Sequence, residues 1–172
     1  VNCPFDREYW PLFEAITFAL YDCGFFPRCA LEVDDSSQVR IEKITDIIRT
    51  CRLSIHDISR VETDGDPPLP RFNMPLELGM FLGAKAFGGR EQKRKAGMVL
   101  DTERYRYQRY ISDIAGQDIR AHGGEVSAVI RHVRNFLSAH SPVPLFLPGP
   151  EKIIARYWHF RDNASRTCEY MH

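Results

Sequence analysis

The chain lacks several features that would assign it to particular classes of protein. Among its 172 residues, Lys plus Arg and Asp plus Glu number 23 each, so no net charge draws it to nucleic acid or to an anionic membrane surface. No apolar run reaches the roughly 18 residues of a membrane span. We therefore expect no membrane partner, consider nucleic acid an unfavoured partner, and expect a sizeable hydrophobic core.

Cysteine and histidine show none of the spacings of common metal or disulfide scaffolds. The five cysteines are odd in number and form no C-x-x-C pair. The six histidines form no H-x-x-x-H pair of the kind that binds zinc on a helix. These patterns predict no metal site, no resident cofactor, and a reducing, cytoplasmic location.

What the chain does have is an alternation of strand-like and helix-like segments. The expected strands are residues 1–5, 25–33, 53–59, 95–101 and 118–124. The expected helices are residues 7–22, 38–51, 73–87, 102–114, 125–139 and 151–161, the second of them capped by Asp34, Asp35, Ser36 and Ser37. Three prolines predict a loop over 62–71. The alternation predicts an α/β fold, a doubly wound (flavodoxin- or Rossmann-like) parallel sheet of four to five strands with helices on both faces.

The alternation ends near residue 140, which divides the chain into two parts. We expect an α/β domain over 1–140 and a C-terminal linker and helix over 141–172. The linker is broken by prolines and carries Leu145, Phe146 and Leu147, which are difficult to leave exposed. We expect this part to pack on the same domain or on a partner.

One expected helix, Asn73 to Phe87, carries a carboxylate in an apolar setting. Glu77 lies between Leu76 and Leu78, and the rest of the helix is apolar nearly all the way round, which predicts a buried helix. Gly79 and Gly83 are spaced to allow close approach of a neighbouring backbone. An ionised carboxylate removed from water costs several kcal/mol unless it is paired. Glu77 therefore either has a structural partner, such as Arg28 or Arg71, or faces a pocket.

Three motifs, in this order, resemble those of the nucleoside 2-deoxyribosyltransferase-like superfamily, to which TIR-like domains are related in layout. They are "VNCPFD" at the start, "HDIS" after the third expected strand, and "N-x-P-L-E-L-G-x-x-L-G" at the helix of Glu77. The resemblance covers residues 1–101. In parallel sheets, ligands lie at the carboxyl ends of the strands, which is where "NCPFD" and "HDIS" fall.

The resemblance implies cleavage or transfer of an N-glycosidic bond in a nucleoside, nucleotide or NAD-like molecule, with NAD as a substrate only. Glu77 would act at C1' of the sugar as nucleophile or oxocarbenium stabiliser, together with Asp57 as a second catalytic residue. The substrate-binding residues it implies are Asn2, Pro4, Phe5, Arg28, Ser59 and Asn73. Relatives often complete their sites across a subunit interface, which implies a homo-oligomer.

The residues themselves leave plainer roles open. Asp57 can cap the turn after its strand through backbone N–H groups, and Ser59 can be a turn hydroxyl. Asn73 can be a helix cap with ligand contact as a second role. Arg28 can hold Glu77, Asp34 or a ligand phosphate.

The chain also departs from the family patterns. Transferases of this kind place a second acidic segment before the glutamate, where this chain has only Asp64 and Asp66 in a proline-rich stretch. NAD-cleaving TIR domains carry an aromatic-cysteine pair before the glutamate, where this chain has Met74 and Pro75. The alternative function is therefore a nucleotide-binding sensor or assembly module that does not catalyse.

Overall fold

A computed structural model describes residues 1–32, 38–64, 69–141 and 146–170 of the chain. These residues form two compact units, each made from two stretches of sequence. The first, here called the sheet unit, comprises Val1–Arg7 and Arg28–Gly123. The second, here called the helical unit, comprises Glu8–Pro27 and Gly124–His172.

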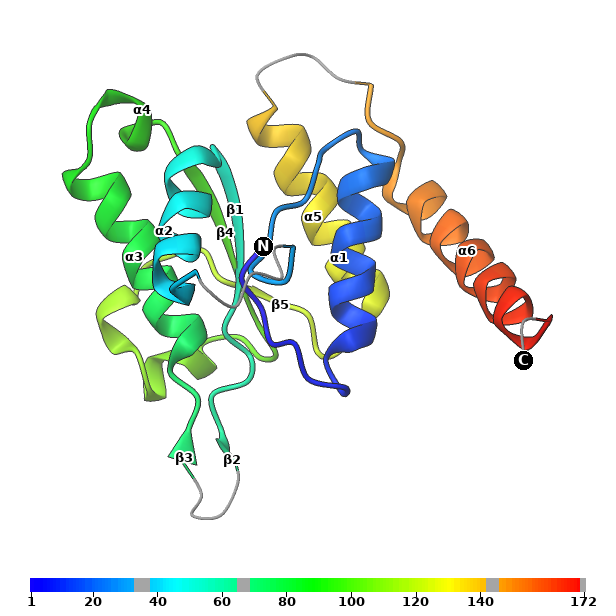
Figure 1. The fold of residues 1–172 in the computed structure, drawn as a ribbon, viewed down its shortest axis with the longest axis horizontal. Coiled ribbons are helices and arrows are strands. Elements are labelled where there is room, and N and C mark those ends of the chain that lie inside the picture. Colours follow the sequence, from blue (N-terminus) through cyan, green and yellow to red (C-terminus); the bar gives the residue numbers. More distant parts are fainter. Residues whose placement is uncertain (33–37, 65–68, 142–145, 171–172) are drawn as a thin grey trace. The chain divides into compact units, whose positions relative to one another are not determined.

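The sheet unit is built on three parallel strands in the order β1-β4-β5. They are β1 (Leu53–Asp57), β4 (Ala96–Asp101) and β5 (Arg120–Ala121). Helices α2 (Arg40–Thr50) and α3 (Asn73–Phe87) pack together beside β1, and the short helix α4 (Arg90–Lys93) follows α3 (Figure 1). The chain is thus α/β with a small open parallel sheet, and the expected strands at 53–59, 95–101 and 118–124 are confirmed, the last as two residues only.

The expected first strand, 1–5, is reduced to one bridge beside β1. The backbone of Asn2 donates to the Ile55 carbonyl at 2.8 Å and accepts from the Asp57 N–H at 2.8 Å. In a parallel ladder the next donor on this side would be residue 4. Pro4 has no N–H, so the pairing ends there.

The prediction of a second strand over 25–33 is wrong for residues 25–32, which form no strand. Val33 lies outside the described residues. Gly24 turns the chain with a φ of 79°. Pro27 then removes a donor, and the Arg28 and Glu32 side chains form an ion pair across a turn. These local interactions hold the segment in a compact conformation.

The proline-rich stretch is more regular than expected. It forms a two-stranded antiparallel hairpin of β2 (Thr63–Asp64) and β3 (Leu69–Pro70). Proline is tolerated at position 70 because both strands of a two-stranded hairpin are edge strands, where a residue can lack an N–H group without breaking a ladder hydrogen bond. The expected helix over 102–114 is instead two 3-10 turns, η1 (Arg106–Arg109) and η2 (Ser112–Ile114).

Helix α3 has the expected bounds but is not buried all round. Met74, Leu78 and Phe81 face the core, whereas Leu76 and Phe87 are 56% and 92% exposed. Gly79 and Gly83 do not mediate a close contact, since a Cβ at either would meet nothing within 4 Å. The close approach occurs on the strand instead, where a Cβ on Gly97 would lie 2.6 Å from Cε1 of Phe81.

The described residues of the helical unit form helices alone (Figure 1). They are α1 (Trp10–Asp22), α5 (Val126–His140) and α6 (Pro150–Tyr170). The expected helix over 125–139 is confirmed as α5, which buries Val129, Ile130, Val133, Phe136 and Leu137 along one face.

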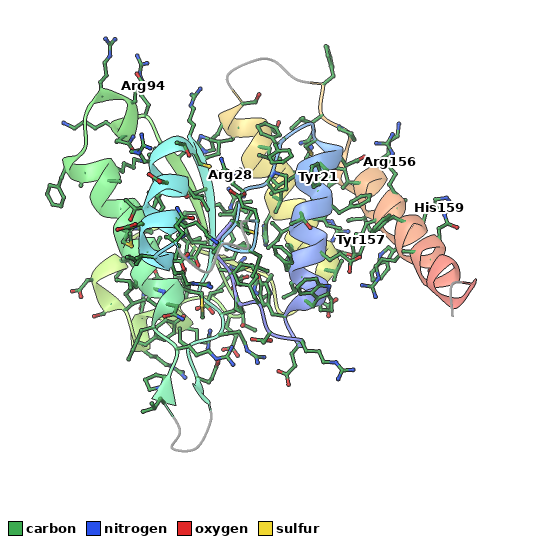
Figure 2. All side chains as sticks on the ribbon, in the orientation of Figure 1. Tyr21, Arg28, Arg94, Arg156, Tyr157 and His159 are labelled. Atoms are coloured by element: carbon green, nitrogen blue, oxygen red, sulfur yellow. The ribbon has the colours of Figure 1, made fainter. Side chains whose placement is uncertain are left out.

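The last helix packs on α1 and α5 within this unit. Arg156 pairs with Asp22 at 2.9 Å, and Arg161 with Glu14 at 2.6 Å. The rings of Tyr157 and Phe18 pack edge to face, with their centroids 5.5 Å apart (Tyr157 and Arg156 are labelled in Figure 2). None of the helices in the described part of the chain is long and apolar enough to cross a membrane.

The close contact between Gly97 and Phe81 gives a stability prediction. We expect Gly97→Ala to destabilise the protein by about 1–3 kcal/mol, because the new methyl group overlaps a ring in a packed core. The matched control is Gly83→Ala, whose new methyl group meets open space. This variant should be more stable than the unmodified protein by up to about 1 kcal/mol, as expected for Ala in place of Gly in a helix. Urea denaturation of both variants checks this; equal effects at the two positions would contradict the packing described.

Candidate functional site

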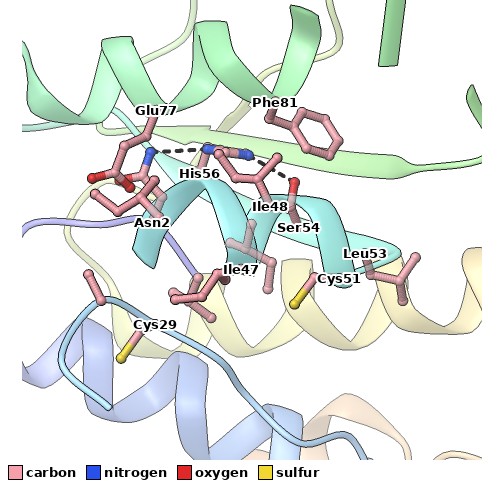
Figure 3. Close-up of a pocket in the computed structure, with 14 residues that line it drawn as sticks. Asn2, Cys29, Ile47, Ile48, Cys51, Leu53, Ser54, His56, Glu77 and Phe81 are labelled. Atoms are coloured by element: carbon pink, nitrogen blue, oxygen red, sulfur yellow. Dashed lines mark hydrogen bonds between the residues drawn. The ribbon is translucent and has the colours of Figure 1, made fainter. Parts of the chain in front are cut away.

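A cavity lies in the sheet unit between α2, α3 and the edge of β1 that carries Asn2 (Figure 3). Its volume is about 40 Å³. The lining residues are Val1, Asn2, Cys29, Ala30, Ile44, Ile47, Ile48, Cys51, Leu53, Ser54, Ile55, His56, Glu77 and Phe81.

Glu77 is half-buried and reaches from α3 into the wall of this cavity. Burial raises the pKa of its carboxyl group, while the nearby charge of Arg40 acts in the opposite direction. The two expected ion-pair partners are engaged elsewhere: Arg28 with Glu32, and Arg71 with Asp6 at 2.9 Å. No hydrogen bond or ion pair joins Glu77 to any side chain of the described residues. The pocket interpretation of Glu77 therefore fits the structure better than the ion-pair interpretation.

A fixed polar chain lies next to Glu77. The Asn2 amide donates from Nδ2 to the Met74 carbonyl at 3.0 Å and to His56 Nδ1 at 3.0 Å. Since Nδ2 can only donate, Nδ1 is the acceptor and Nε2 carries the proton, which points to Ser54 Oγ at 2.8 Å (Figure 3). Burial lowers the pKa of His56 to about 3, so the ring is neutral and both of its nitrogens are in use.

Asp57 does not line the cavity, although it follows His56. Its side chain is fully buried, with Oδ1 accepting from the Ser59 N–H at 2.9 Å and Oδ2 lying 3.2 Å from His122 Nε2. This is the turn-capping role that the sequence left open for Asp57. Ser59 is buried in the turn and lies outside the cavity lining.

The remaining implied site residues are dispersed. Pro4 is buried, Phe5 is half-buried, and neither lines the cavity. Asn73 is exposed at the start of α3 and makes no cap hydrogen bond. Arg28 is held by Glu32 at the protein surface. Of the substrate-binding and catalytic residues that the resemblance implies, Asn2 and Glu77 alone line the cavity. Three other acidic residues named above, Asp34, Asp35 and Asp66, lie outside the described residues.

Cys3 is a buried thiol next to Asn2 in the sequence. Burial raises its pKa well above the usual range, and the charge of Asp57 and, more weakly, that of Glu77 add to that effect.

A second polar cluster lies at the carboxyl end of β4, and none of its residues except Asp57 was among the expected site residues. Asp101 is fully buried and accepts from Arg106 Nη2 at 2.6 Å, and Tyr110 Oη lies 3.0 Å from its other oxygen. His122, beside Asp57, directly follows β5. Asp101 and His122 lie at the carboxyl ends of their strands, which is the signal that could have pointed to this cluster. Among the described residues, no three His, Cys, Asp or Glu side chains are grouped closely enough to hold a metal ion.

The environment of Glu77 predicts a pH-dependent effect on stability. A carboxyl group whose pKa is raised on folding destabilises the folded state once it ionises, and the effect disappears at low pH, where it is protonated in both states. We expect Glu77→Gln to melt at a higher temperature than the unmodified protein at pH 7, and the difference to shrink toward pH 4. Glu103→Gln, at an exposed position, is the control; a Glu77→Gln variant that melts lower at pH 7 would show that the carboxylate is paired.

The neutral, buried state of His56 predicts acid sensitivity. The pKa of His56 is near 6.5 in the unfolded chain and about 3 in the folded chain. At pH values between these two, His56 binds a proton in the unfolded chain and not in the folded chain. The free energy of unfolding should fall with decreasing pH in that window, by up to about 1.4 kcal/mol per pH unit. His56→Gln should reduce this slope, whereas the exposed His140→Gln should not, as measured by urea denaturation from pH 7 to pH 4. Identical slopes in all three proteins would contradict the assignment.

Comparison of the chain with protein-family models, with curated proteins and with solved structures finds no match in any of the three.

Proposed function

We propose that the cavity beside Glu77 binds the sugar of a nucleoside, nucleotide or NAD-like molecule, and that Glu77 assists cleavage or transfer of its N-glycosidic bond. The observation that carries the proposal is the state of Glu77. It is a carboxylate with a pKa raised by burial, it lines a cavity, and among the described residues it has no ion-pair partner. Groups with such perturbed protonation, in a cleft, are concentrated at functional sites.

The chemistry requires one carboxylate at C1' of the sugar. As the C1'–N bond breaks, its electron pair leaves with the base, which takes up a proton from solvent, and positive charge develops on the sugar ring. Glu77 would stabilise that charge, or form a bond to C1' that water or a second base later displaces. The apolar walls around it, such as Ile44, Ile48 and Phe81, would strengthen the interaction by excluding water.

The size of the cavity adds a condition to this proposal. At about 40 Å³ it is smaller than the roughly 300–1,000 Å³ of typical small-molecule pockets. A nucleoside would enter only if α2 moves away from α3 and β1. The polar chain of Asn2, His56 and Ser54 would remain in place during such a movement, because it links the N-terminal segment, β1 and α3 without involving α2.

A second candidate function is nucleotide binding without catalysis. It is favoured by the position of Asp57, which is directed toward Ser59 and His122 and away from the cavity lining. With one carboxylate in place of two, the cavity holds half of the acid-base pair that glycoside cleavage commonly uses.

A substrate panel separates the two functions. Incubation with purine and pyrimidine nucleosides, 2'-deoxynucleosides, nucleotides and NAD, followed by chromatography, should show release of free base from at least one substrate. Because Glu77 would act on the transition state, Glu77→Gln should lower this rate at least about 100-fold, by analogy with the loss of one stabilising group in other enzymes. Glu103→Gln should release base at the unmodified rate.

Calorimetric titration with the same compounds completes the test. Binding that survives in Glu77→Gln, together with no base release by any protein, would establish the non-catalytic function. Neither base release nor binding would overturn both candidates.

A further inference from the structure

A second, larger pocket lies at the opposite end of the strands, where β1 and β4 begin. Its volume is about 360 Å³, and it is lined by Arg49, Thr50, Arg52, Glu91, Gln92, Arg94 and Lys95. Four of these side chains are cationic and one is acidic. The sequence "REQKRK" at 90–95, which reads as a solvated turn, supplies most of one wall.

We propose that this basic pocket binds a small ligand that carries two or more linked phosphate groups. Guanidinium groups suit phosphate because their planar donors can engage two of its oxygens at once. The volume lies in the range of small-molecule sites, and the lining is polar and charged, which suits the phosphate chain of a ligand better than a nucleobase.

The backbone around the pocket is fixed before any ligand arrives. Lys95 is buried, and its ammonium group donates to the carbonyls of Ile48 at 2.6 Å and of Cys51. Gln92 Nε2 donates to the Arg49 carbonyl at 3.1 Å. These donors occupy the carbonyls at the end of α2, whose partial negative charge would otherwise repel an anion.

The arginines of the pocket remain available for a ligand. Within the described part of the chain, Arg49 is paired only with Asp46, at 3.1 Å, and Arg94 only with Glu91, at 3.3 Å; the side chains of both ion pairs are more than half exposed. Such pairs are weak in water and exchange readily for a stronger anion. Arg52 has no side-chain partner among the described residues, and its carbonyl accepts from the Ala96 N–H at 3.1 Å, which fixes its position at the start of the ladder.

The pocket belongs to the sheet unit alone and is separate from the cavity of Glu77. Figure 2 labels Arg94 next to α4, and Figure 3 shows Glu77 at the cavity, with Arg94 absent from its lining. The last turn of α2 divides the two, with Ile47, Ile48 and Cys51 facing the cavity and Arg49 and Arg52 facing the basic pocket.

Calorimetric titration of the full chain with sodium tripolyphosphate at constant ionic strength tests the proposal. We expect binding at one site and a Kd at least ten-fold weaker in Arg52→Glu. Arg104→Glu makes the same charge change at an exposed position beyond the other end of β4, and should leave the Kd within two-fold. Glu91→Gln, which removes the acidic side chain from the pocket lining, should tighten binding.

Three results would overturn the proposal. The first is no binding of tripolyphosphate by the unmodified protein. The second is equal weakening by Arg52→Glu and Arg104→Glu, which would mean that only overall charge matters. The third is a single-stranded oligonucleotide that binds at least ten-fold more tightly than tripolyphosphate and is weakened by Arg52→Glu, which would make the pocket part of a nucleic-acid surface. Glu77→Gln should bind tripolyphosphate normally, so failure here and failure of the proposed function are distinguishable.

Discussion

The arrangement of the cavity depends on the hydrogen bonds of Asn2. Its backbone joins the N-terminal segment to β1, and its amide joins that segment to the first turn of α3 through the Met74 carbonyl. Glu77 lies one turn further along α3, so the same amide sets the distance between this carboxylate and β1. Because the second amide hydrogen is bound by His56, the group has no alternative orientation that keeps both interactions.

The two pockets of the sheet unit differ in chemistry although they share the last turn of α2. Apolar residues of that turn, Ile47 and Ile48, face the cavity, while Arg49 and Arg52 on either side of Thr50 face the basic pocket. Lys95 allows the two pockets to lie so close together, because its ammonium group hydrogen-bonds carbonyls at the end of α2 in place of water. A change in the position of α2 would therefore alter both pockets together.

Parts of the fold could be predicted from sequence where one local signal was sufficient. The strands β1 and β4 and the helix α5 follow from their apolar patterns, and α3 follows from Asn73 and Pro75 at its start and Gly88 after its end; all four were correctly placed. Two expected strands do not form, because pairing depends on partners that periodicity does not report. Pro4 ends the first after a single bridge, and residues 25–32 form a turn, in which Arg28 pairs with Glu32. The direction of a strand-end carboxylate is equally invisible in the sequence. Asp57 and Glu77 were expected at one site, but the Asp57 carboxylate is directed to Ser59 and His122, and His56 of the same strand lines the cavity.

The segment before α1 is attached to β1 by a single bridge, at Asn2. Two backbone hydrogen bonds form that bridge, and the Asn2 amide adds its bonds to the Met74 carbonyl and to His56. Segments held by few hydrogen bonds open locally before the rest of a protein unfolds. Such an opening would admit water to His56, and protonation of the exposed ring would then keep the segment from closing again.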